Sequence, residues 1–263
     1  MLKNIVLLSL LLVSVLSAGC NSSSSSEPSP TTAKVSVYHA GADAPTVNIT
    51  VDGQVAINNL TFSNGVSAEV QAGARQLGVQ VSGLTILQSS LNAVAGQNYS
   101  VFAVDTIGTG VAPGRLSLLV TTDNLSSPPS GQAAIRFLHL SPDAPAVDFV
   151  TFTGGTAALP TGVQPISGFS NVSSVSGRGA ANPSAPNGGN FVTIPAGARV
   201  GVRLAGSTGS LIAEFALPGQ GATAGVAAGK IYTATVQGFL TPPARVGSLT
   251  PARTLQTVTY ANN

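Results

Sequence analysis

The chain has 263 residues, of which 43% are hydrophobic and only 8% are charged, and its formal net charge is +2. This composition excludes an intrinsically disordered protein, because disorder requires low hydrophobicity and usually a high net charge. The 11 Lys and Arg residues form no cluster, which argues against nucleic-acid binding. The single cysteine excludes a disulfide framework within the chain.

Residues 1–19 have the pattern of a secretory signal peptide, with Lys3 ahead of an apolar run from Ile5 to Ala18. The run is shorter than the ~20 residues that a transmembrane helix needs. It ends in Leu-Ser-Ala-Gly-Cys at positions 16–20, which resembles the bacterial lipobox. The resemblance implies a lipoprotein signal peptide whose cleavage leaves Cys20 as a lipidated (palmitate-bearing) first residue. The alternative is an ordinary secretory signal with an incidental cysteine.

The predicted location follows from the same segment. Several acyl chains, each contributing roughly 0.8 kcal/mol per buried CH₂, would hold the protein on a membrane. The residue after the cysteine is Asn21 and not an aspartate. By analogy with lipoproteins of diderm bacteria, this resembles a signal for the outer membrane. We therefore expect an exported protein of the cell envelope, in contact with the membrane through its N-terminal lipid.

Four further segments follow the signal. Residues 20–33 are rich in Ser and Pro and contain little to bury, so they predict a flexible tether. Residues 34–124 and 133–263 are predicted to form two domains, with a Pro- and Ser-containing linker at 125–132. The second domain carries an unmatched, Gly- and Pro-rich loop insertion at about 153–190. Such long loops are either functional or loosely ordered.

Alternation with a period of two dominates both domains, and no stretch after the signal sustains a helical pattern. Turn residues such as Asp52-Gly53 and Ala95-Gly96 separate the alternating runs at short intervals. This spacing predicts an all-β chain of two antiparallel β-sandwiches, Ig-like or transthyretin-like, in tandem. The clearest predicted strands are 66–70, 76–81, 99–104 and 115–122.

One short motif occurs twice, at a constant offset. In each copy a β-rich run ends in a histidine, a turn with Asp-Ala-Pro follows, and a second β-rich run begins. Alternation places His39 and His139 on the core-facing row of their strands and directs Tyr38 outward. The motif residues are His39, Asp43 and Pro45 in the first copy and His139, Asp143 and Pro145 in the second, where Asp148 follows.

The second copy, His-Leu-Ser-Pro-Asp-Ala-Pro at 139–145, closely resembles the pattern of the DUF4397 family. The first copy departs at Gly41-Ala42, where the family has Ser-Pro, and at Asn48, where it has Asp. With matching Ala-Gly-containing turns and Ala-Gly-x-x-Tyr strands, the resemblance implies tandem domains over most of 34–236. The family is one of unknown function, found largely in exported and lipid-anchored bacterial proteins.

Two interpretations of the motif remain open. In the first, each histidine is structural, the aspartate hydrogen-bonds the turn backbone, and the proline keeps the chain extended into the next strand. In the second, His39 with Asp43, and His139 with Asp143, bind a divalent metal. Two such side chains fall short of the four ligands of a closed zinc site, although Asp148, exposed by its parity, could add an oxygen. We therefore predict neither a metal nor another cofactor.

Enzyme motifs are absent: the sequence has no Gly-x-Ser-x-Gly, no P-loop and no His-Glu-x-x-His. We predict a non-catalytic structural or binding module of the envelope, with an envelope protein or a glycan as partner and the 153–190 insertion as the candidate surface. The alternatives are a carbohydrate-binding or metal-binding module, or a divergent envelope hydrolase. Carbohydrate binding would need exposed aromatics, and Tyr38 alone is predicted to point outward.

Overall fold

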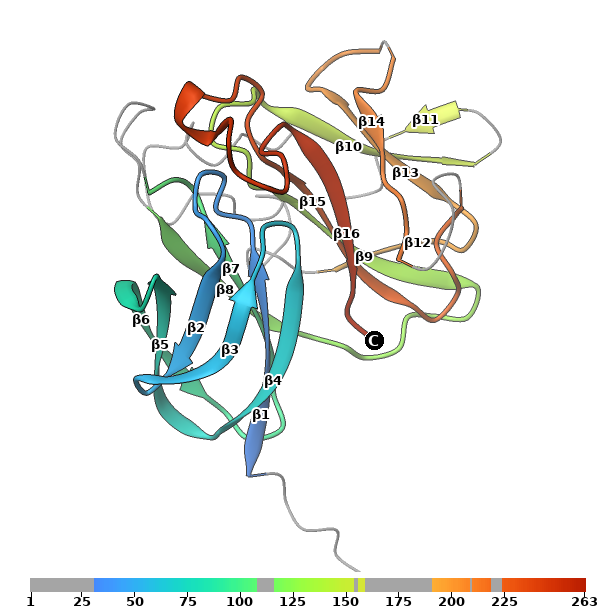
Figure 1. Cartoon of the computed structure of the whole chain (residues 1–263). Coiled ribbons are helices and arrows are strands. Elements are labelled where there is room, and N and C mark those ends of the chain that lie inside the picture. Colours follow the sequence, from blue (N-terminus) through green and yellow to red (C-terminus); the bar gives the residue numbers. More distant parts are fainter. Residues whose placement is uncertain (1–30, 108–115, 154–155, 159–190, 209, 219–223) are drawn as a thin grey trace, which may run out of the picture.

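The computed structural model describes residues 31–107, 116–153, 156–158, 191–208, 210–218 and 224–263. Over these ranges the chain is all-β, with one short 3₁₀ turn, η3 (Ala244–Val246). The β-sandwich prediction is confirmed: four four-stranded sheets are present, and Figure 1 shows them as two packed pairs. The signal, Cys20, residues 20–30 of the tether and most of the predicted insertion lie outside the described residues.

The first sandwich consists of two sheets, which we call inner where the sheet faces the other sandwich and outer where it does not. The first inner sheet has the order β4-β1-β7-β8, and the first outer sheet has the order β3-β2-β5-β6. Tight turns with positive φ at Asp52-Gly53 and Ser82-Gly83 close the β2–β3 and β5–β6 hairpins. The strands are β1 (Thr32–His39), β2 (Val47–Val51), β3 (Gln54–Leu60), β4 (Gly65–Gln71), β5 (Gly73–Val81), β6 (Leu84–Ala93), β7 (Asn98–Val104) and β8 (Ser117–Asp123).

The second sandwich repeats this plan. Its inner sheet has the order β12-β9-β15-β16 and its outer sheet has the order β11-β10-β13-β14, so each strand has a counterpart in the first sandwich. The strands are β9 (Gln132–His139), β10 (Val147–Thr153), β11 (Thr156–Ala158), β12 (Val192–Pro195), β13 (Arg199–Leu204), β14 (Ala213–Glu214), β15 (Ile231–Gln237) and β16 (Gln256–Ala261).

Each inner sheet contains one parallel pair, β1 with β7 and β9 with β15, so the sheets are mixed and not wholly antiparallel as predicted. Between β1 and β7 the chain forms the outer sheet and the inner edge strand β4, and it then runs through β7 in the direction of β1. This is the long crossover that a parallel pair requires.

The core rows follow the predicted alternation. Val35 and Val37 are 2% exposed and face the first outer sheet, and Ile135 and Phe137 take the same places in the second sandwich. Tyr99 and Tyr232 are buried at matched positions, as predicted. Each tyrosine hydroxyl accepts a backbone N–H from the preceding turn, of Val94 and Ala227 respectively.

The faces opposite these rows are also buried, because the two inner sheets stack on each other. A third apolar cluster joins them, formed by Tyr38, Ala40, Phe102, Val104, Leu138, Leu140 and Tyr260. The prediction that Tyr38 points outward was wrong as to exposure. Its side chain points away from the core of the first sandwich, but it is only 5% exposed and its ring stacks on Phe102, with 4.7 Å between the centroids. The layers therefore run outer, inner, inner, outer.

Among the described residues, no helix has the length and apolar character that crossing a membrane would demand.

Candidate functional site: the paired histidine turns and the inner-sheet interface

Both histidines stand at the ends of central strands and are fully buried. His39 Nε2 lies 2.8 Å from the Pro45 carbonyl oxygen, and His139 Nε2 lies 2.9 Å from that of Pro145. A carbonyl can only accept, so Nε2 carries the proton and donates it in both turns. Each histidine thereby ties the end of its strand to the residue that leads into the next one.

Burial holds both rings neutral. Burial is the main cause that lowers the pKa of His39. The Pro45 bond opposes the shift, the nearby Arg253 charge adds to it, and the resulting pKa is about 4. Burial also lowers the pKa of His139, again against the bond to Pro145. Both Nδ1 atoms are buried and make no hydrogen bond. The arrangement suits a structural histidine better than one that exchanges protons near neutral pH.

The two aspartates reach past their own turns to the loop after β7 or β15. Asp43 Oδ1 accepts the backbone N–H of Ile107 at 2.6 Å. Asp143 accepts the backbone N–H groups of Leu240 and Thr241 at 2.7 and 2.8 Å. Ile107 and Leu240 are the third residues after the ends of β7 and β15, so the contact is the same in both copies. The sequence interpretation, which placed these bonds within the turn, did not foresee this reach.

One segment, which we name the strap (residues 238–255), connects the two turns. It leaves the second turn at Leu240, passes through η3, and meets the first turn twice. Arg245 donates to Asp43 Oδ2 at 2.8 Å, and Arg253 donates to the Ala44 carbonyl at 2.7 Å. Figure 1 shows the strap in red over the end of the first sandwich. The two histidine turns thus belong to one continuous structure.

Arg253 is a buried cation, with only 3% of its surface exposed. Its guanidinium carbon lies 4.4 Å from the centroid of the Phe62 ring, and burial lowers its pKa to about 10, with Asp43 opposing the shift. Its Nε and NH1 make no hydrogen bond. The cation is therefore held by one carbonyl, one aromatic face and the field of a nearby carboxylate.

Asp148 does not stand where its parity predicted. It is 2% exposed, because the Leu204–Gly206 corner and Arg203 fold over it. Its Oδ2 accepts the Gly206 N–H at 3.1 Å and lies 3.5 Å from Arg203 Nε. Across the described ranges no three His, Cys, Asp or Glu side chains gather as a metal site would require.

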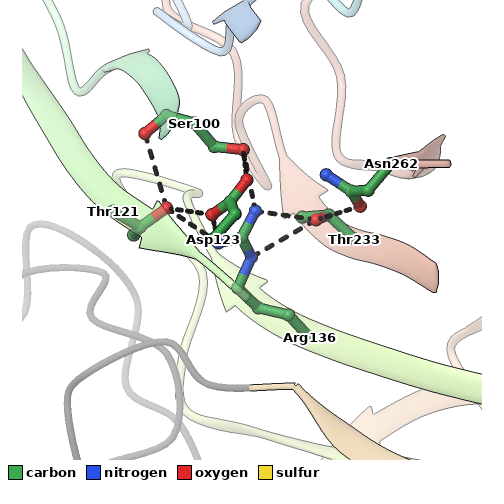
Figure 2. A network of polar contacts seen from close by, with 6 residues as sticks. All are labelled: Ser100, Thr121, Asp123, Arg136, Thr233 and Asn262. Carbon is green, nitrogen blue, oxygen red and sulfur yellow. Dashed lines mark hydrogen bonds and ion pairs between the residues drawn. The ribbon is translucent and has the colours of Figure 1, made fainter. Parts of the chain in front are cut away.

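A buried polar cluster that the sequence did not predict lies between the inner sheets (Figure 2). Arg136 on β9 is fully buried and donates to Asp123 Oδ1 at 2.6 Å and to Thr121 Oγ1 at 2.7 Å, both on β8. Its other nitrogens reach Ser100 of β7 at 3.0 Å and Thr233 of β15 at 2.9 Å. All three guanidinium nitrogens have partners, as a buried cation requires.

A signal for this cluster does exist in the sequence. Residues 133–138 are apolar on both faces except for Arg136, in a chain with only 8% charged residues. A lone charge in a strand that is apolar on both sides points to a buried partner. The partner itself could not be named, because Asp123 lies on another sheet and belongs to the other sandwich.

Comparison with known proteins adds one relationship. No curated protein matches the chain. One family, described as a domain of unknown function, matches from within β1 to within β10 and so includes both copies of the histidine motif. A DUF4397 domain is therefore found at residues 33–150 of this chain.

Proposed function

We propose that this chain is a non-catalytic protein of the bacterial cell envelope, anchored by acylation of Cys20, in which two DUF4397-type sandwiches form one binding or structural unit. The observation that carries the proposal is the repetition of the histidine turn. Both copies make the same two contacts, from His Nε2 to the proline carbonyl and from the Asp carboxylate to the loop after the parallel strand.

The same repetition supports the tandem assignment. The second sandwich has the strand order of the first, with β9, β10, β13 and β15 in the places of β1, β2, β5 and β7. The family match ends at residue 150, so the assignment of the second sandwich to DUF4397 rests on this topology and on the motif.

A non-catalytic role fits the chemistry of the described residues. The motif acids are engaged with backbone amides, and the motif histidines are buried and held neutral. Glycan stacking gains no support, because all four tyrosines are 9% exposed or less. Binding through strand edges and end loops is the mode that such a sandwich leaves open.

The anchor is tested by metabolic labelling of the full-length chain with an alkyne analogue of palmitate, followed by separation of inner and outer membranes. We expect label on the native chain and none on Cys20→Ala, with the native chain in the outer-membrane fraction. Cys20→Ala should be released in soluble form. An unlabelled native chain, or label that survives Cys20→Ala, would overturn the anchor.

A further inference from the structure

The edges of the two inner sheets lie side by side on one flank of the molecule and border a groove of about 360 Å³. One wall is the start of β4, the free edge of the first inner sheet, and the other is the end of β16, the free edge of the second. The rings of Tyr38 and Tyr260, with centroids 4.3 Å apart, also line it.

The hydrogen-bond pattern between β1 and β4 determines which main-chain groups of β4 do not bond to β1. Backbone bonds from His39 N to Asn64 O and from Ala72 N to Thr31 O set the alternation. The pairs Val37–Val66 and Val35–Ala68 are then the hydrogen-bonded ones. The N–H and C=O groups of Gly65, Ser67 and Glu69 consequently point away from β1, at the edge of the sheet.

The other wall has the same character. The bond from Asn262 N to Ile231 O makes Thr233–Tyr260 a hydrogen-bonded pair, so the main-chain groups of Thr259 and Ala261 point away from β15. The β4 wall is the more accessible: Val66 is 44% exposed, whereas Thr259 is 9% exposed.

We propose that the groove binds an extended, uncharged polypeptide segment of a partner protein, which adds to the β4 edge as a further strand. This deepens the binding role proposed above by naming the class of partner. Unused main-chain groups on an exposed edge recognise the main chain of another strand. Among the described residues, the groove lining contains no Asp, Glu, Lys, Arg or His, so it offers a charged side chain no partner.

The alternation also sets the specificity. Tyr38, Tyr260 and Val258 offer an apolar floor, while Ser67 and Asn64 offer hydroxyl and amide groups. An incoming strand presents successive side chains to opposite sides. The matching segment therefore alternates an apolar side chain, placed toward the tyrosines, with small polar ones.

The test uses the full-length chain in mild detergent and a fluorescein-labelled heptapeptide of alternating valine and serine, with binding measured by fluorescence anisotropy. Two further peptides of the same sequence carry N-methyl groups on alternate amides, one peptide for each of the two possible registers. We expect the plain peptide to bind and at least one N-methylated register to bind at least about tenfold more weakly, because it cannot form the main-chain ladder. Equal binding of all peptides, or no binding of the plain peptide at millimolar concentration, would overturn the proposal.

The protein side is tested with a matched pair at Ser67. Ser67→Pro removes an outward N–H without breaking a bond to β1, and proline is tolerated on edge strands. Ser67→Ala removes the same hydroxyl, which lies 2.8 Å from Ser36 Oγ, and keeps the N–H. Both variants lack the hydroxyl, so they differ in the main-chain N–H. We expect Ser67→Pro to bind about tenfold more weakly than Ser67→Ala.

Equal affinity of Ser67→Pro and Ser67→Ala would overturn the pairing to β4. If Ser67→Pro fails to fold, the N-methyl comparison on the native chain still decides the question. The palmitate labelling is independent of both, so failure of the groove and failure of the anchor are distinguishable.

Discussion

Arg136 of β9 and Asp123 of β8 face each other across the two inner sheets, with NH1 2.6 Å from Oδ1 and both side chains removed from solvent. The pair joins the two sandwiches, because each residue belongs to a different one. A buried ion pair adds little net stability compared with apolar residues, but loss of one partner leaves the other charge buried alone.

Arg136→Ala should therefore lower the free energy of unfolding by about 3–5 kcal/mol, measured by urea titration of the full-length chain. The matched control is Arg75→Ala, which breaks a surface pair with Asp52 and should cost less than about 1 kcal/mol. Arg136→Met combined with Asp123→Leu should recover most of the loss. A cost for Arg136→Ala no greater than that of Arg75→Ala would show that the interface does not depend on the pair.

The histidine turns make stability depend on pH with a defined sign. The pKa of His39 is lowered from 6.5 to about 4 in the folded chain, so below pH 6.5 the unfolded chain binds a proton that the folded chain does not. Stability from His39 is complete above pH 6.5 and falls by about 3 kcal/mol as the pH drops toward 4. His139 shifts in the same direction and adds to the loss.

His39→Gln is the control for this pH dependence, because its amide can still donate to the Pro45 carbonyl and does not titrate. The difference in unfolding free energy between the native chain and His39→Gln should change between pH 6.5 and 4 and stay constant above pH 7. A difference that is constant throughout would contradict the buried, neutral histidine.

Asp143 should contribute through its hydrogen bonds to backbone amides. Asp143→Ala leaves the N–H groups of Leu240 and Thr241 without their acceptor, which should cost about 1–3 kcal/mol. Asp143→Asn keeps one acceptor oxygen and should cost less. Both can be measured by thermal unfolding, and equal effects of the two variants would show that the amide contacts do not matter.

Gly65 should be intolerant of any side chain, because a Cβ there would run into the Tyr38 ring. Gly65→Ala should cost about 1–3 kcal/mol by overpacking. In a Tyr38→Ser background the same change should cost much less, and the coupling can be read from a double-mutant cycle of urea unfolding. If the costs of Gly65→Ala and Tyr38→Ser were additive, the destabilisation by Gly65→Ala would not come from a clash with the Tyr38 ring.

The strands were predictable because their core rows alternate cleanly, as in Val35 and Val37 or Tyr99 and Val101. The stacking of the inner sheets was not, because the opposite rows mix Ser, Thr, Tyr and Leu as a solvated face does. Tyr38 consequently looked exposed, although Tyr260 packs against it. Asp148 lies on the outer sheet, and it looked exposed because the Gly206 corner that covers it is distant in sequence.

The histidine turn was predictable in part. Burial of His39 and His139 followed from parity, and the proline after each turn marked the entry to the next strand. The contact of Asp43 with Ile107 and Arg245 spans 64 and 202 positions of the chain. A local sequence pattern cannot predict such a pairing, and no repeated motif in the sequence marks the strap that completes the first turn.

The central place of β1 also determines how the molecule resists a pull. β1 lies between β4 and β7 and is the first described strand after the N-terminal segment (Figure 1). Its backbone hydrogen bonds run across the strand, so tension applied along β1 from its N-terminal end loads them together in shear. A strand at the sheet edge, pulled sideways, would instead release its bonds one after another. The fold thus places a central strand, bonded on both sides, where a pull from the N-terminal segment would act.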